Sequence, residues 1–265
     1  MKILDGRELA DFIKERQSRE AANLQASGQN PTLLIVRDSK NPVIEKYVNL
    51  KIKYGEDIGV KVIDYLAKDS DDIRAAITRA NSDKSIHGII LQLPIQDKDQ
   101  TDSLTSLIAP AKDVDGLSDQ AGAYDSATAT AINWLLAGYD IKLKGLKIAI
   151  VGRGKLVGAP LFRMFTDSHY DVTLFHKGDD LTKLNQYDII ITATGVPGLI
   201  SSDYVKPGAC VVDAGTASEK GVIKGDLADG VRNRTDLTAI TPTTGGVGPL
   251  TVSCLFDHVL QAASE

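Results

Sequence analysis

The chain has 265 residues, which is enough for one large domain or two smaller ones. Its 43% of hydrophobic and 25% of charged residues are ordinary for a globular protein and exclude intrinsic disorder. The formal net charge is −5, from 30 Lys and Arg against 35 Asp and Glu, and there is no long basic run, so nucleic acid is excluded as an expected partner.

No apolar stretch approaches the ~20 residues that span a bilayer, and the N-terminus lacks the apolar core of a secretory signal. We therefore expect no membrane partner and a cytoplasmic location. The two cysteines, Cys210 and Cys254, provide neither zinc-ligand spacing nor a disulfide framework. We expect both to be buried thiols in a reducing compartment.

Short apolar runs alternate with helical patterns along nearly the whole chain, which is typical of βαβ units with a mainly parallel sheet. The predicted strands are Leu33–Val36, Lys61–Ala67, Gly88–Leu93, Lys147–Val151, Asp171–Phe175, Asp188–Ala193, Ala209–Asp213 and Leu237–Ile240. The predicted helices are Arg7–Ala26, Val43–Ile58, Asp71–Asn81, Ala127–Ala137, Val157–Asp167 and Leu250–Ala263.

A segment rich in Asp, Gly and Ser, residues 113–126, separates the first strand and helix units from a new series beginning at Gly145. We predict an α/β fold with two α/β domains flanking a cleft, the second a Rossmann-type doubly wound parallel sheet. The first domain would comprise residues 1–122 and a returning C-terminal helix, 249–265. The second would comprise residues 123–248.

Polar residues interrupt two of the apolar patterns. Lys51 lies within the apolar stripe of a predicted helix, which also contains Tyr47 four residues earlier. Such a lysine either extends outward to water or faces a cleft where burial lowers its pKa. Gln92 interrupts the strand Gly88–Leu93 near its carboxyl end, and it is either a satisfied core amide or a residue facing a ligand crevice.

An acidic loop, Lys112–Gly116, follows the third strand and helix unit. It contains Asp113 and Asp115. The loop is either an exposed acidic turn or a place where a carboxylate accepts paired N–H donors from a heterocycle such as a pterin.

A glycine-rich turn, Gly152–Pro160, connects an apolar strand pattern to a helical one. Its spacing, G-x-G-x-x-x-G, is one residue longer than the common dinucleotide fingerprint. The turn is either a tight strand-to-helix connection or a place where backbone amides at a helix N-terminus hold a pyrophosphate.

The residues after the next strand bear on which dinucleotide would bind. His176 and Lys177 stand where an NAD enzyme usually has an acidic residue for the ribose hydroxyls, and Arg153 lies in the glycine-rich turn. Two cations suit a 2′-phosphate, so NADP is favoured over NAD. Asp179 and Asp180 follow closely and weigh against that preference.

Together these features resemble the bifunctional methylenetetrahydrofolate dehydrogenase/methenyltetrahydrofolate cyclohydrolase family, over nearly the whole chain. Five motifs occur in order: Tyr-x-x-x-Lys at Tyr47–Lys51, Gln-Leu-Pro at Gln92–Pro94, Lys-Asp-Val-Asp-Gly at Lys112–Gly116, the cofactor turn at Gly152–Pro160, and Gly-Gly-Val-Gly-Pro-x-Thr at Gly245–Thr251.

The resemblance implies a role for each matching residue. Lys51 would be the general acid/base of hydrolysis, and Gln92 would hold it and favour its neutral form. Tyr47 would stack on or orient the folate, and Asp115 would bind the pterin. The wall between folate and nicotinamide would include Gly245, Gly246 and Pro249, and the cofactor would be bound by Gly152, Arg153, Gly154, Val157, Gly158, His176, Lys177, Thr194 and Gly195.

The implied activity is oxidation of 5,10-methylenetetrahydrofolate with NADP, followed by hydrolysis of the methenyl product to 10-formyltetrahydrofolate, which serves purine biosynthesis. These residues require no metal, and the resemblance implies a homodimer through the second domain. The alternatives are a shikimate-type NADP dehydrogenase and a folate-binding homologue with weak or no turnover. The chain departs from the family pattern at Ile44, Ser126–Ala129, Gly154 and Thr244.

Overall fold

The structure is a computed structural model that describes residues 1–118, 122–215, 217–219 and 222–265. The chain divides into two compact units, and the division falls within its first and last helices. We name each unit after its larger sheet. The three-stranded unit is Asp11–Ala127 with Val252–Glu265, and the six-stranded unit is Met1–Ala10 with Thr128–Thr251.

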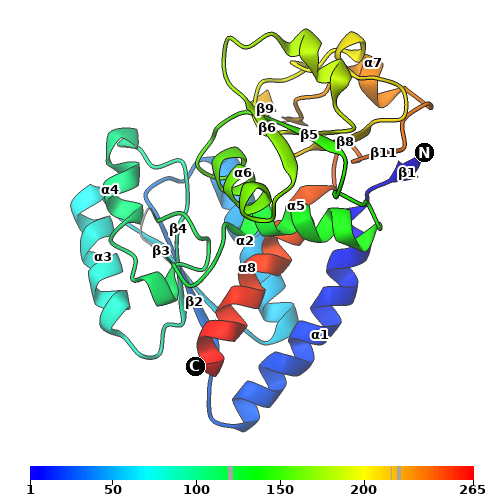
Figure 1. Ribbon diagram of the computed structural model, residues 1–265. Coiled ribbons are helices and arrows are strands. Elements are labelled where there is room, and N and C mark those ends of the chain that lie inside the picture. The colour runs from blue at the N-terminus through cyan, green and yellow to red at the C-terminus, as the bar shows by residue number, and fades with distance from the viewer. Residues whose placement is uncertain (119–121, 216, 220–221) are drawn as a thin grey trace. The chain divides into compact units, whose positions relative to one another are not determined.

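The three-stranded unit contains a parallel sheet in the order β3-β2-β4, which Figure 1 shows with the helices α3 and α4 nearby. The central strand is buried over five of its six residues, as expected for a parallel strand covered on both faces. The elements are α1 (Gly6–Ala26, from Asp11 onward), β2 (Thr32–Arg37), α2 (Pro42–Ile58), β3 (Lys61–Leu66), α3 (Ser70–Ser82), β4 (Gly88–Leu91), η1 (Lys98–Gln100), α4 (Thr101–Thr105), η2 (Pro110–Lys112) and α8 (Val247–Ser264, from Val252 onward).

Helix α2, which carries Lys51, has clear sequence-encoded ends. The Asn41 side chain accepts a hydrogen bond from the Val43 amide at 2.9 Å, and Pro42 occupies the first helical position. Gly59 ends the helix with a φ of 80°, a left-handed conformation that glycine adopts without strain. The buried stripe of α2 is Ile44, Val48, Gly55 and Ile58, as the sequence pattern predicts.

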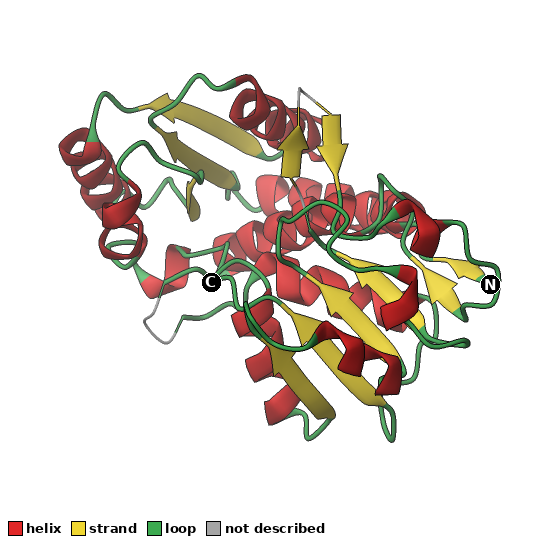
Figure 2. Ribbon diagram, turned by 90° about the horizontal axis from the view of Figure 1, so that it is seen from above, coloured by secondary structure: helices red, strands yellow, loops and turns green. Residues whose placement is uncertain are grey.

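The six-stranded unit contains a parallel sheet in the order β1-β11-β8-β7-β5-β6, the larger group of strands in Figure 2. Strand β5 pairs with β6 on one side and with β7 on the other, so the winding direction reverses there, as in a doubly wound sheet. The elements are β1 (Lys2–Ile3), α5 (Ala127–Gly138), β5 (Lys147–Val151), α6 (Gly158–Asp167), β6 (Asp171–Phe175), η3 (Leu181–Gln186), β7 (Ile189–Thr192), η4 (Ser202–Tyr204), β8 (Cys210–Asp213), β9 (Ala217–Glu219), β10 (Val222–Lys224), α7 (Asp229–Arg232) and β11 (Ala239–Ile240).

The predicted α/β class with a Rossmann-type parallel sheet is confirmed, and each predicted strand and helix is present within a few residues of its expected position. The first ten residues lie in the six-stranded unit rather than with the residues that follow them, because β1 pairs with β11. A two-residue strand leaves no apolar periodicity for the sequence to reveal. Residues 119–121 of the predicted connecting segment lie outside the described residues.

Two element ends differ from prediction in ways that affect candidate residues. Strand β4 ends at Leu91, so Gln92 lies one residue beyond the strand rather than within it. Helix α8 begins at Val247, so Pro249 lies in its first turn rather than before it. Proline is tolerated there because the first helical N–H groups have no partner within the helix.

Both cysteines are buried, as predicted. Burial raises the pKa of the Cys210 thiol to about 12 and also raises the pKa of the Cys254 thiol. Neither thiol is therefore reactive near neutral pH.

Candidate active site

Lys51 and Gln92 are brought together in the three-stranded unit. The Lys51 Nζ donates a hydrogen bond to the Gln92 Oε1 at 2.8 Å. The Gln92 Nε2 donates to the Leu93 carbonyl at 3.0 Å, which fixes the amide with its oxygen toward the lysine. The Gln92 backbone N–H continues the ladder to the Val36 carbonyl at 2.8 Å. The pair therefore stands at the carboxyl edge of the parallel sheet, the usual ligand position in α/β folds.

The acidic loop reaches the same edge because it runs beside β4. Asp113 forms a parallel bridge with Ile89, which places Asp115, two residues on, level with the end of the strand at Leu91. The two carboxylates then differ in role. Asp113 is 2% exposed and accepts hydrogen bonds from the backbone of Gly116 at 3.1 Å and Ser118 at 2.7 Å, so it shapes the loop.

Burial acts in opposite directions on the two remaining charged groups. It lowers the pKa of the half-buried Lys51, an effect that Asp115 partly opposes. It raises the pKa of Asp115 to about 6, with Lys51 opposing the shift and Asp113 adding to it. An amine with a lowered pKa gives up its proton more readily than an ordinary lysine does, so this cluster can perform general acid/base chemistry.

Tyr47 lies one helical turn before Lys51 on α2 and is half-buried. Burial raises the pKa of its phenol, which therefore stays protonated near neutral pH. Lys112, in contrast, is not part of the cluster. Its Nζ donates to the carbonyls of Ala80 at 2.8 Å and Asp83 at 2.7 Å, where a cation stabilises the end of α3.

Two residues that the sequence did not reveal support the acidic loop. The ring of His258, on α8, places Nδ1 2.8 Å from the Val114 carbonyl, and Tyr124 stacks on it with a centroid separation of 4.8 Å. Burial lowers the pKa of His258, which favours a neutral ring whose Nδ1–H donates to that carbonyl. No sequence pattern relates positions 144 residues apart.

The glycine-rich turn between β5 and α6 has a close-packed part and an open part. A Cβ on Gly158 would lie 1.8 Å from the Gly152 carbonyl oxygen, and one on Gly152 would lie 2.6 Å from the Ala193 oxygen. A Cβ on Gly154 would meet nothing within 4 Å. Val157 gives α6 no side-chain cap, and the Ala159 N–H of the first turn donates instead to the Gly154 carbonyl at 3.1 Å. These features fit the phosphates of a dinucleotide.

The other predicted cofactor residues follow β5 or the strands on either side of it. Arg153, His176 and Lys177 are exposed, and Thr194 and Gly195 follow β7 after one intervening residue, Ala193. Asp179 accepts the His176 backbone N–H at 2.6 Å, and the Asp180 carboxylate accepts from Thr182. The carboxylates of Asp179 and Asp180 therefore accept hydrogen bonds within their own turns.

The predicted wall residues Gly245 and Gly246 have a packing role within the six-stranded unit. The Gly6 N–H donates to the Gly245 carbonyl at 2.8 Å. A Cβ on Gly245 would lie 2.3 Å from the Arg7 Cζ, and a Cβ on Gly6 would lie 1.8 Å from the Gly246 oxygen. Glycine is therefore required at Gly6 by this close approach and is favoured at Gly245 by its φ of 90°.

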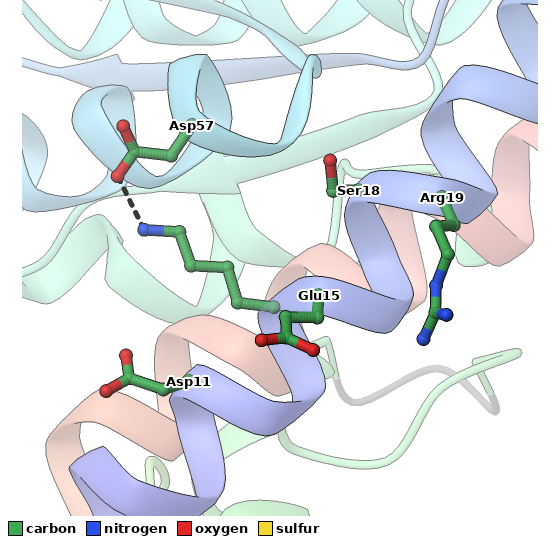
Figure 3. A pocket seen from close by; sticks show the side chains of 6 residues that line it. Asp11, Glu15, Ser18, Arg19 and Asp57 are labelled. Carbon is green, nitrogen blue, oxygen red and sulfur yellow. Dashed lines mark hydrogen bonds and ion pairs between the residues drawn. The ribbon is translucent and has the colours of Figure 1, made fainter.

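A surface hollow of about 430 Å³ lies elsewhere on the three-stranded unit (Figure 3). It contains none of the predicted site residues, and an ion pair of 2.5 Å joins Lys14 to Asp57 beside it. Across the described ranges, no group of His, Cys, Asp and Glu side chains could hold a metal ion. None of the helices in those ranges is sufficiently long and apolar to span a bilayer.

The fold and these residues define a dehydrogenase with a dinucleotide-binding unit. The family description "Tetrahydrofolate dehydrogenase/cyclohydrolase, catalytic domain" matches residues 4–115, and "Tetrahydrofolate dehydrogenase/cyclohydrolase, NAD(P)-binding domain" matches residues 126–265. The chain therefore belongs to the tetrahydrofolate dehydrogenase/cyclohydrolase family. This confirms the resemblance and favours it over a shikimate-type dehydrogenase.

Similar proteins match along the full chain. The bifunctional protein FolD of Macrococcus caseolyticus is 35% identical over 100% of this chain and 98% of its own length. The structure of the bifunctional FolD enzyme from Campylobacter jejuni has a TM-score of 0.93 and 33% identity, covering 100% of this chain and 99% of its own. The Trypanosoma brucei FolD structure, complexed with NADP cofactor and inhibitor, has a TM-score of 0.90 and 28% identity, covering 99% of this chain and 97% of its own.

Because burial raises the pKa of Asp115 to about 6, its charge costs stability at neutral pH. The folded protein takes up this proton at a higher pH than the unfolded chain does. Above pH 6 we expect Asp115→Asn to raise the thermal unfolding midpoint, by roughly 2–4 °C for each kcal/mol that the substitution adds to the free energy of unfolding. The gain should shrink as the pH falls from about 6 to about 4.

The measurement is calorimetry across this range, with Asp125→Asn as the control, because Asp125 is an exposed carboxylate close by in the chain. A lower midpoint for Asp115→Asn at pH 8 would mean that attraction to Lys51 outweighs the cost of burial.

Proposed function

We propose that this chain oxidises 5,10-methylenetetrahydrofolate to the 5,10-methenyl form with NADP and hydrolyses that product to 10-formyltetrahydrofolate. Membership of the family supports both activities. The observation that carries the hydrolytic half is the Lys51 amine held 2.8 Å from Gln92 Oε1, with its pKa lowered by burial.

In hydrolysis, Lys51 acts as the general acid/base. The neutral amine accepts a proton from the water whose oxygen bonds to the methenyl carbon. As the bond from that carbon to N5 of the folate breaks, one water proton is delivered to N5 and the other is released to solvent. The product is the formyl group on N10. An amine is suited to both transfers only if its pKa lies near the working pH.

The neighbouring side chains position the folate and the lysine. Gln92 accepts the lysine hydrogen bond with a neutral oxygen, so the lysine keeps a partner whether or not it is protonated. Asp115 binds the N–H groups of the pterin, and Tyr47 stacks on or orients the folate. Gly245, Gly246 and Pro249 form the wall between folate and nicotinamide.

NADP, when bound, supplies the hydride acceptor of the oxidation. We assign its pyrophosphate to the turn formed by Gly152, Gly154, Val157 and Gly158, where the open face of Gly154 supports the assignment. The exposed cations Arg153 and Lys177 hold the 2′-phosphate, His176 contacts the cofactor beside them, and Thr194 and Gly195 contact it through their backbone. Hydride transfer itself depends mainly on alignment of the two reacting carbons.

We assign folate binding to residues 1–122 with 249–265, and NADP binding to residues 123–248. The proposal extends to a homodimer formed through the second of these domains, to a cytoplasmic location, and to a supply of formyl groups for purine biosynthesis. These three parts of the proposal rest on the resemblance to the family.

The direct test is a spectrophotometric assay of the purified chain with methylenetetrahydrofolate, with NADP and NAD supplied in parallel. We expect reduced nicotinamide to form faster with NADP and methenyl absorbance to stay low because hydrolysis removes that product. No reduction with either cofactor, together with retained tetrahydrofolate binding, would instead indicate a folate-binding homologue without turnover.

Lys51→Met should separate the two activities, because it keeps most of the side-chain packing and removes the proton carrier. We expect hydrolysis of methenyltetrahydrofolate to fall by at least about 100-fold, the usual contribution of a general acid/base, while part of the hydride transfer remains. In the unchanged chain, hydrolysis should rise with pH through the lowered pKa of Lys51, because the neutral amine is the base. Equal loss of both activities would mean that Lys51 mainly binds substrate.

The matched control for that experiment is Lys53→Met, which removes an exposed lysine from the same helix. It should leave both rates near those of the unchanged chain.

Lys177→Gln should weaken the preference for NADP. Removing one cation from the 2′-phosphate should raise the KM for NADP about tenfold, equivalent to about 1.4 kcal/mol, and leave the KM for NAD unchanged. Steady-state kinetics with both cofactors measure this, with the exposed Lys183→Gln as the control. A parallel rise for NAD would show that Lys177 does not discriminate between the two.

A further inference from the structure

The loop that follows β7 is held from within by a buried carboxylate. Asp226 is 0% exposed. Its Oδ2 accepts the Thr194 N–H at 2.7 Å, and its Oδ1 accepts the Val196 N–H at 3.1 Å. Both oxygens therefore bind one loop, on either side of Gly195, which is exposed with a φ of 67°.

A second carboxylate fixes Asp226 in turn. Asp213, at the end of β8, accepts the backbone N–H of Asp226 at 3.0 Å and of Leu227 at 3.2 Å. Arg232 donates to the same Asp213 carboxylate. The Asp226 carboxylate, which binds the loop, thus belongs to a segment that is hydrogen-bonded to the end of β8 through Asp213.

The space around the two carboxylates admits no further side chain. A Cβ on Gly215 would lie 2.0 Å from the Asp226 Oδ1, and one on Gly225 would lie 2.0 Å from the Asp213 Oδ2. Arg232 forms an ion pair with Asp213. Burying the Asp226 carboxylate beside that of Asp213 is costly, so a neutral side chain would serve a purely structural connection better.

The placement of this arrangement suggests what it is for. The loop leaves β7 beside Gly152, the residue that follows β5, at the point where the strand order reverses. Ligands of doubly wound sheets bind at that point. Since Asp226 accepts the amides of Thr194 and Val196, the exposed Gly195 between them is held in a fixed position at this edge of the sheet.

We propose that Asp226 is a positioning residue for NADP: it holds the loop of Thr194 to Val196 in the orientation that binds the cofactor. The inference rests on the proposed function. An ionised carboxylate can accept both amides at once, whereas an asparagine has one acceptor oxygen and would turn an NH₂ donor toward the second amide. Asp226→Asn should therefore release one side of the loop.

The test compares Asp226→Asn with the full unchanged chain. NADP binding by titration calorimetry and the KM for NADP should both weaken about tenfold, as expected for loss of one charge-assisted hydrogen bond. The KM for methylenetetrahydrofolate should change by less than twofold. So should the rate of methenyltetrahydrofolate hydrolysis without cofactor, because Lys51 and Gln92 belong to the other unit. A mere loss of folding would lower both activities together.

Asp188→Asn is the matched control, because Asp188 also accepts a backbone N–H, that of Lys147 at 2.8 Å, and pairs with Lys206, but at the amino ends of β5 and β7. It should leave NADP affinity unchanged.

If Asp226→Asn does not fold, Arg232→Gln tests the same network through Asp213 and should weaken NADP binding about threefold, a smaller effect because the carboxylate itself remains. NADP affinity equal to that of the unchanged chain in a folded variant would overturn the inference. Failure of the unchanged chain to bind NADP would instead overturn the proposed function.

Discussion

The Lys51 amine, half-buried against the Gln92 carbonyl oxygen, is the constraint on which the chemistry of the three-stranded unit depends. A lysine in an apolar helical stripe needs a partner, and the nature of the partner decides its charge. A carboxylate at position 92 would hold the lysine protonated, whereas the amide oxygen satisfies one hydrogen bond without adding charge. The charge of Asp115 favours protonation of Lys51, and the pKa of Asp115 is itself raised to about 6. The Lys51 amine therefore loses its proton more readily than an ordinary lysine does.

Both parallel sheets place their candidate residues by the same rule. Gln92 follows β4, Gly152 follows β5, His176 follows β6 and Thr194 follows β7. Since carboxyl ends of parallel strands meet at one edge, a short loop after each strand brings its residues to a common place. Two departures from the family pattern, Gly154 and the connector Ser126–Ala129, agree with the packing at their positions. Gly154 lies on the open face of its turn, and the replaced connector begins with buried small residues, including Ser126 at 2% exposure, so packing accounts for their size.

The sequence was informative where periodicity or its interruption carried the signal. Apolar runs predicted the main strands, and Lys51 and Gln92 stood out because each is polar within an apolar pattern. Short elements such as β1 and α7 were missed because two to four residues show no period. In the loop Lys112–Gly116 the family resemblance implied a role for Asp115 but none for Lys112 or Asp113, because only the fold shows that Lys112 caps α3 and that Asp113 accepts hydrogen bonds from the loop backbone. The contact of His258 with the Val114 carbonyl depends on α8 packing against a loop 144 residues earlier in the chain, so no local sequence pattern reveals it.

The buried aspartates show why burial alone does not identify a functional carboxylate. Asp113, Asp213 and Asp226 each accept backbone N–H groups, so their charge is used to fix a loop. Within the described residues the Asp115 side chain accepts no backbone N–H group, and burial raises its pKa. A carboxylate that is desolvated without internal donors leaves its acceptor oxygens for a ligand. By that criterion Asp115 is the member of the set suited to bind substrate directly, while Asp226 acts on the cofactor only through the loop that it holds.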